Sequence, residues 1–314
     1  MKIAAITVWL PDLGWVEAMG GLPEPMTADV WTGGEDLPDS ADEVEIVVIP
    51  FGVPGSRLAV LDKLPKLRLV QLMSAGAERV IPHIPAGVTL CNARGAHDPA
   101  VAEWIMAVIL AQLRSLPGYA EAQHAGTWAP APSEPLAGQT ALIVGYGSIG
   151  EAVERLLVPF GVRVERVARH PRPGVSGPGV SGPGDLPALL PRADIVILLV
   201  PVTPDTVGLA DARFLGAMHD HALLVNAARG AIVDTSALLA ELSSGRLRAA
   251  IDVTDPEPLP PGHPLWSAPG LLLTPHVAGL STQTIARARA IVWDQLARYA
   301  AGQPLRNVVG EQGY

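Results

Sequence analysis

The chain has 314 residues, a length that predicts two domains. Hydrophobic residues make up 49% and charged residues 17%, which is enough apolar material for two cores and excludes a disordered chain. Lys and Arg number 22 against 31 Asp and Glu, and this formal charge of −9, without a basic block, argues against binding to nucleic acid or to an anionic membrane surface.

The cysteine content and the length of the apolar runs indicate the cellular compartment in which the protein is expected. The one cysteine, Cys91, can form no intrachain disulfide and no cysteine-rich zinc site, so we expect no metal. The start, MKIAAITVWLPD, lacks a signal-peptide cleavage site. The longest uncharged apolar stretches, Trp104–Leu113 and Ile195–Val202, are shorter than the roughly 20 residues that span a bilayer. We therefore expect a cytoplasmic protein without a membrane partner.

The first part of the chain alternates short strands with helical segments such as Arg57–Leu64. Such alternation predicts a parallel sheet covered on both faces. The predicted strands are Lys2–Leu10, Val44–Pro50, Leu67–Met73 and Val88–Asn92.

A long helix is predicted next, over Ala100–Ser115, because Asp98 can cap it and Pro99 suits its first turn. An arm that contains Trp128, Gly126–Pro135, follows. A second α/β series then begins, with helices such as Glu151–Phe160 and Thr235–Ser243, and it is typical of a doubly wound nucleotide-binding domain. Its predicted strands are Ala141–Val144, Arg163–Ala168, Asp194–Val200, Ala222–Asn226, Ala249–Asp252 and Gly270–Leu273. A last helix, Ser281–Ala301, can return the chain to the first unit.

One low-complexity segment, Pro173–Gly184, repeats PGVSG twice in tandem. Such a segment cannot bury apolar area, so we expect a mobile surface loop that arose by duplication and has no function.

A glycine-rich GxGxxG motif follows the first strand of the second series and opens a helix. Gly145 permits the tight turn, Gly147 lets the backbone approach a pyrophosphate, and Gly150 lets the helix pack close to the sheet. The helix start, with Ser148 and Ile149, offers N–H groups and a partial positive charge to the phosphates. We expect a dinucleotide here.

The end of the next strand indicates which dinucleotide. An NAD site has an acidic residue about 20 positions after the glycines, but Ala168 stands there and Arg169 follows. With no carboxylate to repel a 2′-phosphate and an arginine to pair with it, NADP(H) is favoured and NAD(H) remains possible. The alternative is that Arg169 is a solvated residue and the site uses backbone contacts only.

Polar residues follow three later strands: Arg229, Glu257 and His276. Because the carboxyl ends of parallel strands face the ligand crevice, all three are placed to reach one cleft. Arg suits a carboxylate or carbonyl oxygen, His transfers protons near neutrality, and a neighbouring Glu holds the imidazole ring. From spacing alone, solvated charges and a structural histidine are the alternative.

Several further motifs occur in one order along nearly the whole chain, and with them the chain resembles the D-isomer-specific 2-hydroxyacid dehydrogenases, which include glyoxylate/hydroxypyruvate reductases. The matching segments are LVQLMSAG (69–76), NARGAHDPAVAEW (92–104), GYGSIG (145–150), ADIVILLVPVTPDT (193–206), LLVNAARGAIVDTSAL (223–238), IDVTDPEPLPPGHPLW (251–266) and LLTPHVAG (272–279).

This resemblance implies roles for the residues. Arg229, Glu257 and His276 match the catalytic Arg, Glu and His of the family, and Arg229 with the backbone N–H groups around Ala75 and Gly76 would bind the keto acid. The expected cofactor contacts beyond the phosphate loop and Arg169 are Pro201, Thr206, Ala227 and Asp252. The acid with which the family selects NAD is absent at Ala168.

The resemblance also implies an architecture of two Rossmann-like domains. A doubly wound cofactor domain, 97–285, is inserted in a smaller flavodoxin-like substrate domain, 1–96 and 286–314. A homodimer is expected, with the helix Ala100–Ser115 and the arm at its interface. Trp128 would either contact the partner's active site or only pack in the interface.

The implied function is an NAD(P)H-dependent reduction of a small 2-keto acid such as glyoxylate or hydroxypyruvate. Glu257 argues against formate, because formate dehydrogenases of this superfamily carry Gln there. The chain ends at Tyr314 without a regulatory domain, which argues against the long phosphoglycerate dehydrogenase type. The alternatives are a dinucleotide-sensing scaffold for protein partners and a dehydrogenase for an unusual hydride donor such as phosphite.

Five other positions have mainly structural expectations. Phe51 and Met73 either line the substrate pocket or pack in the core, and His97 is expected at the domain junction. His219 and His221 are expected in a solvated turn, because a third metal ligand is lacking nearby.

Overall fold

The computed structural model describes residues 5–173 and 179–310. The chain divides into two compact units. Unit 1 comprises Met1–His97 with Ser281–Tyr314, and unit 2 comprises Asp98–Leu280. Both units contain a parallel sheet with helices, so the predicted α/β fold class is confirmed.

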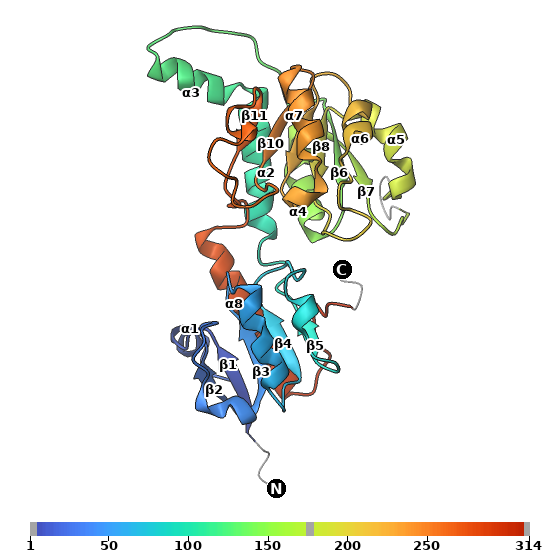
Figure 1. The fold of residues 1–314 in the computed structure, drawn as a ribbon. Coiled ribbons are helices and arrows are strands. Elements are labelled where there is room, and N and C mark those ends of the chain that lie inside the picture. The colour runs from blue at the N-terminus through green and yellow to red at the C-terminus, as the bar shows by residue number, and fades with distance from the viewer. Residues whose placement is uncertain (1–4, 174–178, 311–314) are drawn as a thin grey trace. The chain divides into compact units, whose positions relative to one another are not determined.

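Unit 1 has a five-stranded sheet in the order β2-β1-β3-β4-β5, which is the flavodoxin-like order. Apolar side chains alternate between its two faces. One face packs on α1 (Gly14–Ala18) and on α8 (Thr282–Ala300), the last helix, which returns to this sheet (Figure 1). The other packs on the 3₁₀ segment Gly55–Lys63. The strands are β1 (Ile6–Leu10), β2 (Met26–Val30), β3 (Val44–Ile49), β4 (Leu69–Leu72) and β5 (Thr89–Cys91).

Two local features of unit 1 differ from what the sequence predicts. Strand β2 was not predicted, because its sequence MTADV is short, partly polar and only partly buried at the sheet edge. The segment Arg57–Leu64, expected as an α-helix, forms part of the 3₁₀ segment. Its apolar contacts come mainly from Leu58 and Leu61, three residues apart, which suits three residues per turn.

Unit 2 has a six-stranded sheet in the order β11-β10-β9-β8-β6-β7. The order reverses between β6 and β8, the switch point beside which a doubly wound sheet binds its ligand. Helices α2 and α4 cover one face, and α5, α6 and α7 cover the other (Figure 1). The strands are β6 (Thr140–Val144), β7 (Arg163–Val167), β8 (Ile195–Leu198), β9 (Leu223–Asn226), β10 (Arg248–Ile251) and β11 (Leu271–Leu273). The helices are α2 (Asp98–Leu113), α3 (Leu116–His124), α4 (Ser148–Leu157), α5 (Leu186–Leu189), α6 (Ala212–Ala217) and α7 (Thr235–Ser243).

The predicted long helix is α2, and it ends where Ser115 adopts a left-handed backbone with φ 52°. In the described part of the chain no single helix is long and apolar enough to cross a membrane. Only α2 and α3 together reach that length and composition, and they are bent by 65°. Most of the apolar surface of α2 is buried in the core of unit 2.

The tandem-repeat segment is more ordered than expected at its end. Val180 pairs with Arg172, Ser181 pairs with Val167, and the Val180 side chain is 8% exposed. The expectation of a mobile loop is therefore wrong at Val180 and Ser181, because pairing with Arg172 and with the edge strand β7, respectively, satisfies their backbone. Residues 174–178, which comprise most of the first repeat and the first residue of the second, lie outside the described residues.

Candidate active site

Three predicted residues lie on loops at the carboxyl edge of neighbouring strands in unit 2. Arg229 follows β9, Glu257 follows β10 and His276 follows β11. Gly230 is required here, because a Cβ on it would lie 2.0 Å from the backbone carbonyl of Thr254. This glycine lets the loop after β9 approach the loop after β10.

Glu257 and His276 are in direct contact. The Nδ1 of His276 lies 2.6 Å from Oε1 of Glu257. The carboxylate accepts the Nδ1–H, which leaves Nε2 as the nitrogen that can exchange a proton with a ligand. The two side chains are 45% and 32% exposed, so a small molecule can reach the pair.

Asp252 supports the loop that carries His276. Its carboxylate is 2% exposed and accepts hydrogen bonds from the Thr274 hydroxyl at 2.6 Å and from the N–H groups of Val277 and Ala278, each at 2.8 Å. Its backbone oxygen accepts the N–H of His276 at 2.7 Å. These bonds hold His276 at a φ of 56°, a left-handed backbone that costs free energy for a side chain other than glycine.

Asn226 supports Arg229 in a similar way. Its Nδ2 donates to the Arg229 carbonyl at 3.0 Å, and its Oδ1 accepts from the Ala228 N–H at 3.0 Å. The Arg229 guanidinium donates to the Ala228 carbonyl at 2.7 Å. Asn226 was not predicted as a site residue. The signal was a polar residue at the end of the apolar strand LLVN, since a buried amide must be hydrogen-bonded.

The glycines of the phosphate loop have the geometry that a dinucleotide site needs. Gly145 has a φ of 105°, and a Cβ on it would lie 2.5 Å from the backbone of Leu199. A Cβ on Gly150 would lie 3.2 Å from the Gly145 carbonyl oxygen, so α4 starts close to the sheet. A Cβ on Gly147 would meet no described atom within 4 Å, which leaves room for a phosphate beside the N-terminus of α4 at Ser148. Ile149 is partly buried against the core beneath. The loop thus fits a pyrophosphate.

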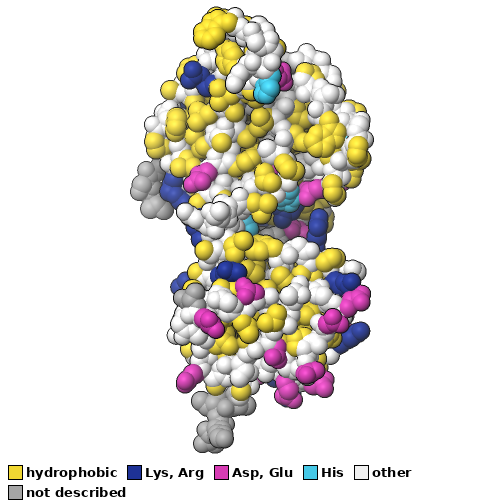
Figure 2. Space-filling view, turned by 90° about the vertical axis from the view of Figure 1, so that its left-hand side faces the viewer, with side chains coloured by type: hydrophobic (Ala, Val, Ile, Leu, Met, Phe, Trp, Pro, Cys, Tyr) yellow, Lys and Arg dark blue, Asp and Glu magenta, His cyan; other side chains and the backbone are white. Residues whose placement is uncertain are grey.

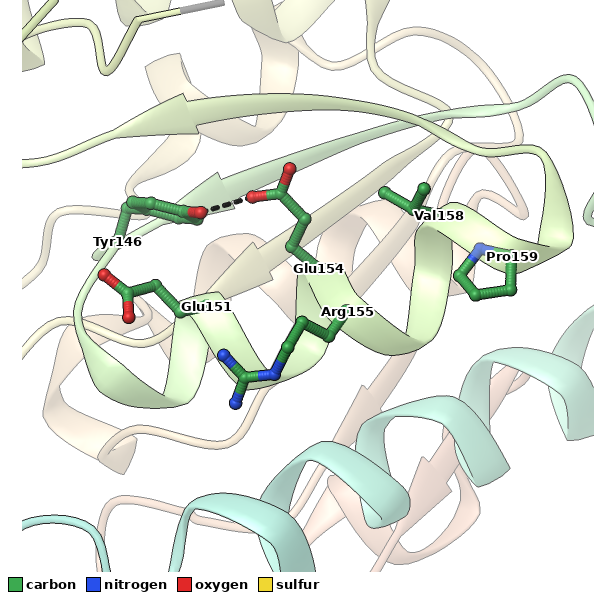
Figure 3. Close-up of a pocket in the computed structure, with 6 residues that line it drawn as sticks. All are labelled: Tyr146, Glu151, Glu154, Arg155, Val158 and Pro159. Carbon is green, nitrogen blue, oxygen red and sulfur yellow. Dashed lines mark hydrogen bonds between the residues drawn. The ribbon is translucent and has the colours of Figure 1, made fainter. Parts of the chain in front are cut away.

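A polar cluster lies beside this loop, at the edge strand β7. The Tyr146 ring is 5.6 Å from the guanidinium carbon of Arg166 and 5.5 Å from that of Arg172, and Arg172 also donates to the Tyr146 carbonyl at 3.1 Å. The Tyr146 hydroxyl donates to Glu154 (Figure 3), and Arg166 donates to the same carboxylate. Burial raises the pKa of Glu154, but hydrogen bonds from Arg166 and Tyr146 outweigh it and hold the pKa below its ordinary value. Glu154 therefore stays ionised and neutralises Arg166.

The open pocket in Figure 3, of about 520 Å³, contains none of the predicted site residues. It is lined by Tyr146, Glu151, Glu154, Arg155, Val158 and Pro159. Arg169 is exposed just beyond β7, where the sequence predicts a contact to a 2′-phosphate, and Ala168 precedes it.

The remaining predicted cofactor contacts lie on two strand ends. The Thr206 hydroxyl donates to the Pro201 carbonyl at 2.6 Å and accepts from the Thr203 N–H at 2.8 Å, so Thr206 fixes the turn after β8. Ala227 is half-buried directly after β9. In the described residues no group of three or more His, Cys, Asp or Glu could hold a metal ion.

The predicted substrate-binding residues Ala75 and Gly76 belong to unit 1, in the turn after β4. The Ser74 hydroxyl donates to the Gly76 carbonyl at 3.0 Å. Phe51 lies edge-on to the ring of His97, with ring centres 6.1 Å apart, and is 42% exposed. Met73 is a core residue at 5% exposure.

The lone cysteine is buried in unit 1. Burial, only partly offset by a hydrogen bond with Gln295, raises the pKa of Cys91 to about 11. In unit 2, His219 is half-exposed and its Nε2 lies 3.3 Å from Asp194.

Known proteins that resemble this chain indicate its family. The family model "D-isomer specific 2-hydroxyacid dehydrogenase, NAD binding domain" matches residues 106–278. The chain is 31% identical to a glycerate dehydrogenase of Methylorubrum extorquens over 89% of each chain, and 33% identical to a glyoxylate/hydroxypyruvate reductase B of Citrobacter koseri over 81% of each. An NADPH-dependent glyoxylate/hydroxypyruvate reductase of Sinorhizobium meliloti, solved with NADP and sulfate, is 26% identical with a TM-score of 0.84, covering 99% of this chain and 100% of that one. The resemblance inferred from the sequence is confirmed: the chain belongs to the D-isomer specific 2-hydroxyacid dehydrogenase family, oxidoreductases that use NAD(P) and act on CH–OH groups.

Proposed function

We propose that this protein is an NADPH-preferring reductase that converts a small 2-keto acid to the D-2-hydroxy acid, with glyoxylate and hydroxypyruvate as the first candidates. The observation that carries the proposal is the 2.6 Å contact of Glu257 with His276, on the sheet that also carries the phosphate loop. A dinucleotide-sensing scaffold has no need of such an acid–base pair.

The residues act on the keto group as follows. A bound nicotinamide supplies the hydride for the carbonyl carbon. The Nε2–H of His276 donates a proton to the carbonyl oxygen, while Glu257 holds the Nδ1–H and stabilises the charged ring. Arg229 binds the substrate and stabilises negative charge developing on the oxygen. Because the His276 side chain is 45% exposed, it regains its proton from water.

Two further roles complete the proposal. The backbone N–H groups around Ala75 and Gly76, in the turn after β4, bind the carboxylate of the keto acid. Arg169 pairs with the 2′-phosphate of NADPH, and the complex of the Sinorhizobium meliloti relative with NADP supports this preference. Pro201, Thr206, Ala227 and Asp252 would line the rest of the cofactor site.

The protein is further proposed to be a cytoplasmic homodimer. Exposed hydrophobic side chains support the dimer: Leu116 is 54% exposed, and Trp128, on the arm after α3, is 95% exposed. Figure 2 shows a face of unit 2 on which hydrophobic side chains predominate and charged side chains are few. Such a surface is typical of a protein–protein interface.

The test is to follow the absorbance of NADPH and NADH, in parallel, with a panel of 2-keto acids. We expect turnover with at least one of them, a higher kcat/KM for NADPH, and a loss of about 10²–10⁴-fold in kcat for His276→Ala. His219→Ala, which removes a half-exposed histidine outside the site, is the control and should keep wild-type kcat. Unchanged turnover in His276→Ala would reject the mechanism, and equal use of NADH would reject the role of Arg169.

A further inference from the structure

The turn after β4 in unit 1 carries two backbone donors without a protein acceptor. Among the described residues, the N–H groups of Gly76 and Ala77 donate to no protein acceptor, although Gly76 is half-buried and Ala77 is fully buried. Buried N–H groups are nearly always paired, so two adjacent unpaired ones indicate a place for an anionic ligand.

Asn92 fixes the orientation of this turn. It follows β5 directly, is 2% exposed, and uses both ends of its amide. The Nδ2 donates to the Ala75 carbonyl at 2.8 Å, and the Oδ1 accepts from the Arg94 N–H at 3.1 Å. Because the carbonyl can only accept and the N–H can only donate, the amide has one possible orientation.

The orientation of one peptide group follows from this bond. In a trans peptide the carbonyl oxygen and the next N–H point in opposite directions. Since the Ala75 carbonyl points toward the Asn92 amide, the N–H of Gly76 points away from Asn92. Ser74 holds the Gly76 carbonyl in the same manner, which directs the N–H of Ala77 away from the Ser74 hydroxyl. Without Asn92, the Ala75–Gly76 peptide group could rotate and present its carbonyl oxygen to the ligand.

We propose that Asn92 is a positioning residue for substrate binding: it turns the Ala75–Gly76 peptide group so that N–H donors, and no carbonyl oxygen, meet the carboxylate of the keto acid. This inference rests on the proposed function, which assigns that carboxylate to this turn. It adds a residue that touches no reacting atom and whose loss weakens substrate binding more than it slows turnover.

The test uses the full-length protein with Asn92→Asp, which keeps the shape but removes the Nδ2 donor, and Asn92→Ser, which removes the amide without adding charge. We expect the KM for glyoxylate to rise at least about tenfold in both, with kcat and the KM for NADPH within about twofold of wild type. Asn307→Asp is the matched control, because Asn307 also donates its amide to a backbone carbonyl, that of Arg94 at 3.1 Å, but in the loop after β5 and not in the turn after β4.

A second measurement does not depend on turnover. Oxalate, a dianion similar in size to glyoxylate, should raise the melting temperature of the wild type and of Asn307→Asp, and should have at most a small effect on the Asn92 variants. If oxalate stabilises a wild type that reduces no keto acid, the proposed function fails and the anion site stands.

The proposal on Asn92 is overturned in three cases: the variants keep the wild-type KM and oxalate response, only kcat falls, or neither variant folds, since Asn92 would then have a structural role alone.

Discussion

The Asp252 side chain accepts three hydrogen bonds from the loop that carries His276. We therefore expect a substitution of this one residue to change both stability and catalysis. In Asp252→Asn an NH₂ group replaces one oxygen and must face the Val277 or Ala278 N–H, because both carboxylate oxygens accept from backbone. We expect stability to fall by about 2–4 kcal/mol and kcat by about 10²-fold, since an unpaired buried donor is costly and His276 moves. Thermal unfolding and steady-state kinetics measure the two effects.

Asp234→Asn is the matched control for that change. Asp234 caps α7, and its Oδ1 accepts from the N–H groups of Ser236 and Ala237, so the substitution is chemically the same at an exposed site. It should cost about 1 kcal/mol or less and leave kcat unchanged. A variant of Asp252 that only raises the KM for NADPH, with unchanged stability, would contradict the role of Asp252 in holding the His276 loop.

Asn92, Asn226 and Asp252 follow one design. Each lies at the last position of a buried strand or directly after it, each is at most 2% exposed, and each bonds to the backbone of a loop that carries site residues. Burying a polar group without a partner costs several kcal/mol, so these loops are held in one conformation. The residues of this design that contact no ligand are the hardest to find from sequence, because only the fold shows which backbone group they reach.

At the scale of an element, the strand–loop–helix β6–α4 depends on Gly145. An alanine there would combine a φ of 105° with a Cβ 2.5 Å from the Leu199 backbone, so β6 and β8 would have to move apart. We expect Gly145→Ala to lose at least about 3 kcal/mol of stability and to bind NADPH at least about tenfold more weakly. Denaturant unfolding and a fluorescence titration with NADPH measure these changes.

Gly245→Ala separates the two causes. Gly245 also has a positive φ, of 72°, but a Cβ on it would meet no described atom within 4 Å. It should therefore lose only about 1 kcal/mol and keep its affinity for NADPH. Equal losses in the two variants would mean that the backbone conformation alone, and not the approach of β8, requires a glycine at 145.

The elements of unit 2 could be predicted closely because their sequence signals are strong and local. These signals are the six apolar strands bounded by turns and the glycines at fixed spacing. Each of them is formed by residues that are close together in the sequence. Strand β2 could not be predicted, because it exists only by pairing with β1 at the sheet edge. Val180 could not be placed for the same reason, since its partner, Arg172, belongs to another segment. The proposed catalytic side chains of the site could be predicted from the sequence. The hydrogen bond between Glu257 and His276 could not, because the two residues are 19 positions apart and only the fold brings them together.

In the whole molecule, the stability of the proposed dimer depends strongly on one side chain, Trp128. Trp128 is 95% exposed, in an arm that the Tyr119 hydroxyl joins to its own unit through the backbone of Ala131. An indole buried on association removes about 200 Å² from water, worth up to about 5 kcal/mol. Covering this exposed indole with a second copy of the chain would therefore stabilise the dimer.

We therefore expect the wild type to have twice the chain mass of 32.8 kDa in light scattering, and Trp128→Ser to raise the dimer dissociation constant at least about tenfold. Trp266→Ser is the control, because Trp266 is 55% exposed but its indole N–H donates to the Pro260 carbonyl within its own loop. If Trp128 also reaches the partner's site, dissociation and the KM for the keto acid will change together. An unchanged dimer with a raised KM would assign Trp128 to the substrate alone, and a monomeric wild type at micromolar concentration would contradict the dimer.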